Sequence, residues 1–113
     1  DDEESQRQIT SSILNRLGYT AFTVDNGEKA IEYIRHEPVD LLLLDMVMDP
    51  GISGYETYRR ILQIQPDQRA VVASGYFNPD DQDKIRALGV SQYLTKPFSV
   101  TSLARAVQEE IRR

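Results

Sequence analysis

Five polar residues of this sequence stand directly after short apolar runs or directly before the first helical pattern. They are Asp1, Asp2, Asp45, Ser74 and Lys96. In a parallel sheet, all strands end at the same edge, and ligands bind in the crevice beside that edge. If the apolar runs form such a sheet, we therefore expect three carboxylates, one hydroxyl and one ammonium group to converge there.

These residue types suit metal-assisted phosphoryl transfer. Clustered carboxylates repel one another, and oxygen ligands without His or Cys favour a hard cation such as Mg²⁺. An Asp carboxylate can act as a nucleophile that accepts a phosphoryl group. The transfer then depends on positioning and on charge neutralisation by the metal, a lysine and a hydroxyl. Each residue alone could be an ordinary terminus, turn or surface residue, but the set predicts a phosphorylation site with Asp45 as the acceptor.

Two alternating periodicities predict the elements that position this set. Short β-rich or apolar runs predict strands over 19–24, 39–44, 70–73 and 92–95. Helical spacing predicts helices before Gly18, between Asn26 and Pro38, over about 54–63, from Asn78-Pro79 through Leu88, and from Val100 onward. Inward faces are predicted at Ile9, Ile13, Leu14 and Leu17 in the first helix, and at Val100, Leu103, Ala104, Val107 and Ile111 in the last. Strands that alternate with helices predict a parallel sheet covered by helices on both faces.

A strand is missing ahead of the first predicted helix. Only Asp1 and Asp2 come before it, although the alternation of strands and helices in the rest of the chain favours a strand there. In the strand order implied by the family resemblance given below, this missing strand is the ladder partner of residues 19–24. Our hypothesis is that a run of roughly five apolar residues belongs immediately upstream of Asp1 or comes from another chain.

Composition excludes several classes of protein. The 113 residues carry a net charge of −5, with 40% hydrophobic and 27% charged residues and no cysteine. An acidic chain lacks the basic surface of a nucleic-acid binder, and the lack of cysteine excludes disulfides and thiolate metal sites. No apolar run approaches the roughly 18 residues that span a bilayer. We therefore expect one soluble domain over residues 1–113, in the cytoplasm, with no membrane insertion and no direct contact with nucleic acid.

The motif set resembles one known family along essentially the whole chain. Asp1-Asp2, Asp45 at the end of an apolar strand, Ser74-Gly75 and Lys96-Pro97-Phe98 are similar to the receiver domain, or response-regulator domain, of two-component signalling. The resemblance implies an α/β, flavodoxin-like, doubly wound five-stranded sheet of order 2-1-3-4-5 with helices on both faces. The first strand of that sheet would be largely absent from this chain.

The resemblance also assigns a role to each site residue. It implies that Asp45 is the phosphoacceptor and that Asp1, Asp2, Asp45 and the backbone carbonyl of Val47 hold Mg²⁺. Lys96 would pair with the phosphoryl group. Ser74 and Tyr93 would form a switch, in which the hydroxyl moves onto the phosphate and the aromatic ring swings inward.

Partners follow from the same resemblance. The phosphoryl donor would be the phosphohistidine of a histidine kinase or phosphotransfer protein, and a homodimer could form through the face made by the fourth helix, fifth strand and fifth helix. The chain would catalyse its own phosphorylation and hydrolysis without being a turnover enzyme. The segment Met48-Asp49-Pro50-Gly51 has one residue more than the usual Met-Pro pattern, which resembles receivers attached to hybrid sensor kinases.

Three alternatives remain open. A phosphatase with an Asp nucleophile commonly needs a second acid two residues later, where this chain has Val47. A flavin-binding module would need a phosphate-cradling loop after its first strand, where Asp1 and Asp2 would repel phosphate. The third alternative is a receiver that is never phosphorylated, which the complete residue set argues against.

Overall fold

Three parallel strands lie between two layers of helices in the part of the chain that the structure, a computed structural model, describes: residues 3–45, 52–75 and 79–112. The elements in chain order are α1 (Glu3–Arg16), α2 (Gly27–His36), β1 (Leu42–Asp45), α3 (Gly54–Ile64), β2 (Ala70–Ser74), α4 (Pro79–Ala87), β3 (Gln92–Thr95) and α5 (Val100–Arg112). The sheet order is β1-β2-β3, and both strand pairs are parallel. The helices and the strands at 42–45, 70–74 and 92–95 agree with the sequence prediction to within a few residues.

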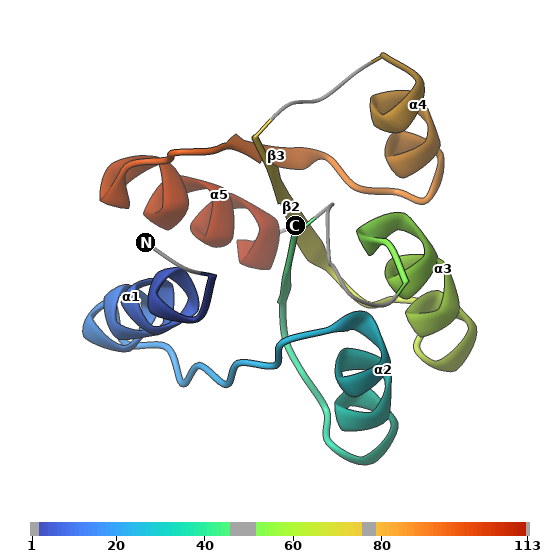
Figure 1. Cartoon of the computed structure of the whole chain (residues 1–113), viewed down its shortest axis with the longest axis horizontal. Helices are drawn as coiled ribbons and strands as arrows, with labels where there is room; N and C mark the ends of the chain where they lie inside the picture. The colour runs from blue at the N-terminus through green and yellow to red at the C-terminus, as the bar shows by residue number, and fades with distance from the viewer. Residues whose placement is uncertain (1–2, 46–51, 76–78, 113) are drawn as a thin grey trace.

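Alternate residues of β2 face opposite layers, because side chains along a strand point to opposite faces. Ala70 and Val72 pack with Tyr58 of α3 and Ile85 of α4. Val71 and Ala73 pack with the buried side of α5. Figure 1 shows the result, with α1 and α5 on one side of the sheet and α2, α3 and α4 on the other. The predicted coverage of both faces is therefore confirmed for this sheet.

The start of α2 packs unusually close to α3. A Cβ atom built on Gly27 would lie 2.0 Å from Thr57 Oγ1 and 2.8 Å from Ile52 Cγ1. Thr57 is completely buried, and its hydroxyl donates to the Ser53 carbonyl at 2.8 Å. Only glycine fits at position 27, because any side chain would enter space that α3 already fills.

The strand predicted over residues 19–24 is not present. These residues form no strand, and Phe22 is 71% exposed. In the described part of the chain, no strand lies between this segment and β1. A strand needs a ladder partner to satisfy its backbone groups, so β propensity alone did not produce one here.

The predicted inward faces of α1 and α5 were only partly correct. Ile9 and Leu17 of α1 are 60% and 42% exposed, and Val100 at the start of α5 is 52% exposed. The fully buried positions of α5 are Leu103, Ala106, Val107 and Glu110, whereas Ala104 and Ile111 are half-buried. Apolar spacing indicates which side of a helix is apolar, but not how far the neighbouring elements extend along that side.

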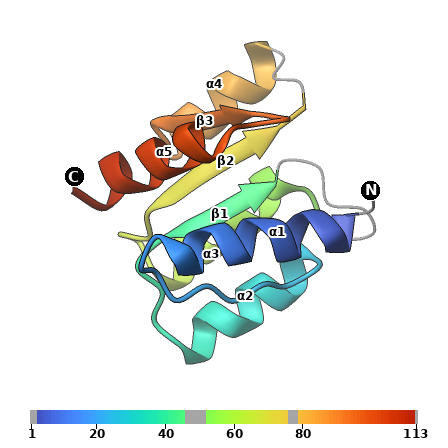
Figure 2. The same ribbon diagram turned by 90° about the vertical axis from the view of Figure 1, so that its left-hand side faces the viewer.

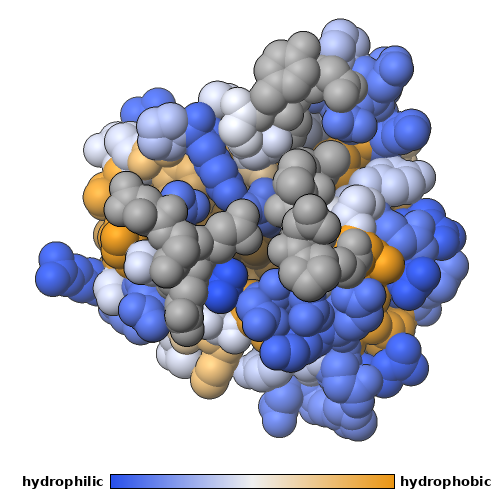
Figure 3. Space-filling model, viewed as in Figure 1, coloured by the Kyte–Doolittle hydropathy of each residue, from blue (hydrophilic) through white to orange (hydrophobic). Residues whose placement is uncertain are grey.

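Helix α4 is anchored by a single buried residue, Ile85. Its other residues are mostly charged or polar, and Figure 3 shows hydrophilic surface over α4 and α2, with apolar surface confined to separate patches. Asn78, the predicted N-cap of α4, lies outside the described residues. No described helix is both long enough and apolar enough to cross a membrane.

Candidate functional site

The carboxyl ends of the three strands form one edge of the sheet. β1 ends at Asp45, β2 ends at Ser74, and Lys96 follows the last residue of β3. Figure 2 shows that the first turn of α1 lies at the same edge as the arrowheads of β1 and β2. The fold therefore gathers the ends of separate chain segments where a crevice for a ligand is expected.

Lys96 and Asp45 are in direct contact across this edge. The Lys96 ammonium donates a hydrogen bond to Asp45 Oδ2, although 51 positions separate the two residues in the chain. Both side chains are partly shielded, with 30% and 28% exposed. The backbone N–H of Lys96 also donates to the Ser74 carbonyl at 2.8 Å, which fixes the start of the Lys96 loop against the end of β2.

Ser74 and Tyr93 lie on neighbouring strands. Ser74 is buried, with 3% exposure, at the end of β2. Tyr93 pairs in register with Val72 and packs against the apolar cluster that contains Val72. Its hydroxyl donates a hydrogen bond to the Val90 carbonyl at 3.0 Å. Ser74 pairs with Thr95, which lies two residues after Tyr93 on β3. The two predicted switch residues are therefore near each other on neighbouring strands.

The other predicted metal ligands belong to segments that the structure does not describe. Asp1, Asp2 and Val47 lie outside the described residues, as does the segment Met48–Gly51. Among the described residues, no group of three or more His, Cys, Asp or Glu side chains could hold a metal ion. Asp45 contributes a partly exposed carboxylate, which is a donor that hard cations prefer.

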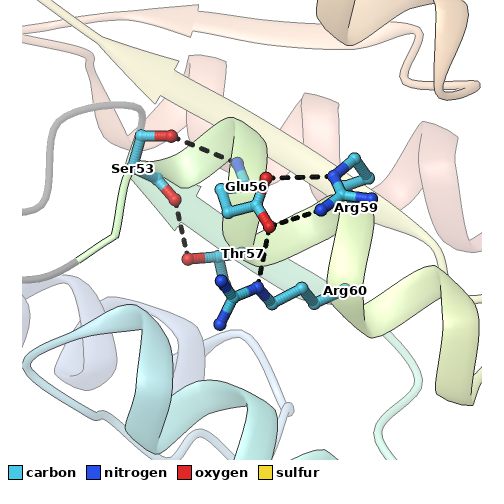
Figure 4. A network of polar contacts seen from close by, with 5 residues as sticks. All are labelled: Ser53, Glu56, Thr57, Arg59 and Arg60. Carbon is cyan, nitrogen blue, oxygen red and sulfur yellow. Dashed lines mark hydrogen bonds and ion pairs between the residues drawn. The ribbon is translucent and has the colours of Figure 1, made fainter.

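A polar network fixes the start of α3 (Figure 4). Ser53 is the N-cap, and its hydroxyl accepts a hydrogen bond from the Glu56 N–H at 3.1 Å. Glu56 binds Arg59 through two hydrogen bonds of 2.9 and 2.6 Å and Arg60 through one of 2.7 Å. These hydrogen bonds, first from Arg59 and then from Arg60, lower the pKa of Glu56 to about 2.

We expect this carboxylate to make folding stability depend on pH. The folded pKa of Glu56 lies below its ordinary value of 4.5, so its stabilising contribution is complete above about pH 4.5 and is lost as the pH falls toward 2. The variant Glu56→Gln should therefore melt at a lower temperature than the unmodified chain at about pH 6, by a margin that shrinks by about pH 3. Glu109→Gln, which alters an exposed glutamate of α5, is the control. A margin that stays constant across this range would contradict the assigned pKa.

Two residues near this site, Ser99 and Arg105, were not predicted from the sequence. Ser99 caps α5, because its Oγ accepts a hydrogen bond from the Ser102 N–H at 3.0 Å. A serine three residues after Lys96 and just before a helix is a signal that could have been recognised. Arg105 of α5 borders a groove beside β3, and no sequence signal distinguishes it from other surface arginines.

The fold and the site geometry define a receiver-type α/β domain. Residues 1–108 match the family described as response regulator receiver domain, and the chain belongs to this family. It is 30% identical to sporulation initiation phosphotransferase F of Bacillus subtilis over 109 residues, covering 96% of this chain and 87% of that protein. It is also 34% identical over 103 residues to the autoinducer 1 sensor kinase/phosphatase LuxN of Vibrio campbellii, covering 91% of this chain but 12% of LuxN. Relatives therefore include both short proteins and receivers within hybrid sensor kinases.

Solved structures share the fold closely. A response regulator from Burkholderia pseudomallei is 26% identical with a TM-score of 0.85, covering 99% of this chain and 65% of that chain. The receiver domain of sensor histidine kinase PA1611 from Pseudomonas aeruginosa is 23% identical with a TM-score of 0.87, covering 100% and 93%. At 23% identity, the similarity to the PA1611 receiver shows a shared fold and nothing more.

Receiver domains are phosphoaspartate signalling modules and in general are not turnover enzymes.

Proposed function

We propose that this chain accepts a phosphoryl group on Asp45 from a phosphohistidine of a histidine kinase or phosphotransfer protein. The observation that carries the proposal is the direct contact between Lys96 and Asp45 at the carboxyl edge of the sheet. A lysine held on the acceptor carboxylate can neutralise the charge that develops during phosphoryl transfer. The family membership and the similarity to a sporulation phosphotransferase support the same assignment.

The step that we propose is a displacement at phosphorus. A carboxylate oxygen of Asp45 attacks the phosphorus atom, the bond to the donor imidazole nitrogen breaks, and the electron pair remains on that imidazole. Asp45 becomes an acyl phosphate, which is later hydrolysed. The Lys96 ammonium pairs with one phosphoryl oxygen, and the Ser74 hydroxyl donates a hydrogen bond to a second one.

Mg²⁺ is the metal that we propose for this site. Asp1, Asp2, Asp45 and the Val47 carbonyl would hold it, and it would neutralise the charge of the phosphoryl oxygens. In support, these ligands are all oxygen donors, and the first turn of α1 lies at the site edge (Figure 2). The PA1611 receiver was solved with magnesium in its active-site cleft, and the Burkholderia protein with a phosphorylated aspartate and calcium.

Phosphorylation would then shift a two-state equilibrium. The hydroxyl of Ser74 would move onto the phosphate, and Tyr93 would turn inward, changing the face formed by α4, β3 and α5. That face would contact a downstream partner or a second copy of the chain. We further propose that residues 1–113 form one domain in the cytoplasm, and that the complete sheet has five strands in the order 2-1-3-4-5.

Removal of the metal tests the proposal. Incubation with a ³²P-phosphohistidine donor and Mg²⁺ should label the chain, and mass spectrometry of borohydride-reduced peptides should locate the modification at Asp45. Excess EDTA should suppress labelling by roughly 100-fold or more, because the phosphoryl charge would no longer be neutralised by the metal. Labelling that persists in EDTA, or that occurs at another residue, would contradict the proposed role of Mg²⁺ or of Asp45 respectively.

A further inference from the structure

A groove lies at the amino ends of the strands, at the opposite edge of the sheet from Asp45. Tyr19, residues 39–40, residues of the segment 65–69 and Ile111 line it, and we call it the amino-edge groove. Its volume is about 470 Å³, within the range of about 300–1,000 Å³ that is typical of ligand sites. The groove is therefore large enough for a small organic molecule.

The carboxyl ends of two helices meet at this groove. Each helix returns the chain from the carboxyl end of a strand to the amino edge of the sheet. Gln65 is the C-cap of α3, and Ile111 belongs to the last turn of α5. Figure 2 shows the carboxyl end of α5 on the opposite side of the molecule from the arrowheads of β1 and β2. The carboxyl end of a helix carries partial negative charge, so the groove favours a cation.

Hydrogen bonds hold the segment 65–69 in one shape. The Gln68 N–H donates to the Gln65 carbonyl at 3.1 Å, and the Tyr58 hydroxyl donates to the Gln68 carbonyl at 2.6 Å. The side-chain amide nitrogen of Gln68 donates to the Arg69 carbonyl at 3.0 Å, and Arg69 Nη1 donates to the Ile111 carbonyl at 2.6 Å. A site that is already ordered loses little conformational entropy when a ligand binds.

Two acceptors in this segment have no partner within the described part of the chain. The Gln68 side chain lines the groove and is only 8% exposed, yet its amide oxygen accepts no hydrogen bond there. That oxygen is still accessible, because no sealed side-chain polar atom among the described residues lacks a partner. Asp67 precedes Gln68, and its exposed carboxylate forms no hydrogen bond or ion pair with the described residues. A ligand that donates hydrogen bonds and carries positive charge would satisfy both groups.

We infer that the amino-edge groove binds a small organic cation that consists of a primary ammonium group on a short apolar stem. The ammonium donates to the Asp67 carboxylate and to the Gln68 amide oxygen. The stem lies against Tyr19, Val39 and Ile111, which are half-buried and line the groove. A hard metal ion suits this site less well, because it takes six or more oxygen ligands and gains nothing from the apolar surface. The inference goes beyond the proposed function and does not depend on it.

A titration followed by NMR tests this site directly. 2-Phenylethylamine is added to the ¹⁵N-labelled chain in about 20 mM NaCl, where exposed charges are weakly screened. Saturable shifts of backbone amide signals should concentrate at residues 65–69 and at Ile111. 2-Phenylethanol lacks the charge and methylammonium lacks the apolar stem, so each should bind at least about fivefold more weakly than the amine.

Two pairs of variants locate the contact. Asp67→Asn should weaken binding of 2-phenylethylamine at least about fivefold, whereas Glu109→Gln, which removes an exposed carboxylate of α5 outside the groove, should change it less than about twofold. Gln65→Lys supplies a tethered ammonium beside Asp67 and should also weaken binding. Gln63→Lys makes the same change at an exposed glutamine of α3 that does not line the groove, and it should leave the affinity unchanged. The dispersion of the amide signals verifies that each variant is folded.

Several results would overturn the inference. Shifts that do not saturate or that spread over the whole surface would show that the amine has no defined site. Equal affinity for 2-phenylethanol would remove the role of the charge, and equal losses in Asp67→Asn and Glu109→Gln would reduce the effect to net charge. Tighter binding of a lysine blocked at both its α-amino and carboxyl groups would overturn the small-molecule assignment in favour of a lysine side chain of a partner protein.

Discussion

Replacing Asp45 with alanine should abolish transfer of phosphate from a phosphohistidine donor. Asp45 is the carboxylate that Lys96 contacts, and alanine offers no oxygen to attack phosphorus. We expect labelling to fall at least 1,000-fold, to the background of the assay, because removal of a nucleophile costs far more than removal of a supporting charge. The measurement is incorporation of ³²P from the donor in the presence of Mg²⁺.

Asp40→Ala is the matched control for this experiment. Asp40 is exposed and lies just before β1, so it stands at the opposite end of the strand from Asp45. Its replacement should leave labelling within about twofold of wild type, since surface substitutions away from a site have small effects. Circular dichroism would verify that both variants are folded. Equal loss in the two variants, or strong residual labelling of folded Asp45→Ala, would refute the assignment of Asp45 as acceptor.

The variant Gly27→Ala should be strongly destabilised. In a helix interior, alanine is favoured over glycine by about 1 kcal/mol, so helix propensity alone predicts a more stable protein. At Gly27 the added methyl group would lie 2.0 Å from Thr57 Oγ1, and Thr57 is completely buried. Forcing α2 and α3 apart should cost about 3 kcal/mol of unfolding free energy, a large part of the stability of a small domain. Urea denaturation measures this loss as a lower midpoint.

Two further variants identify the cause of that loss. Gly75→Ala adds the same methyl group where no other atom of the described residues lies within 4 Å, and it should change the unfolding free energy by less than about 1 kcal/mol. Thr57→Ala combined with Gly27→Ala should recover part of the loss, because the closest colliding atom is removed and contacting residues are energetically coupled. Equal midpoints for Gly27→Ala and Gly75→Ala would show that the α2–α3 contact tolerates a side chain.

The alternation of apolar strands and amphipathic helices was readable from local sequence. Strands at 42–45, 70–74 and 92–95 and the helices between them follow from hydrophobic periodicity, since side-chain direction repeats with a fixed period along each element. The order of polar residues after those strands also predicted that Lys96 and Asp45 would share one edge. The elements could be predicted because each depends on residues close together in the chain, and the shared edge could be predicted because all strands of a parallel sheet end at the same edge.

Only the tertiary structure decided the remaining features. Residues 19–24 have the composition of a strand but form none, because a strand also needs a neighbouring partner. The close approach of Gly27 to Thr57 depends on how α2 packs against α3. The position of Arg105 beside β3 depends on how α5 packs against that strand. Such contacts join segments far apart in the chain, and packing rather than local propensity determines their geometry.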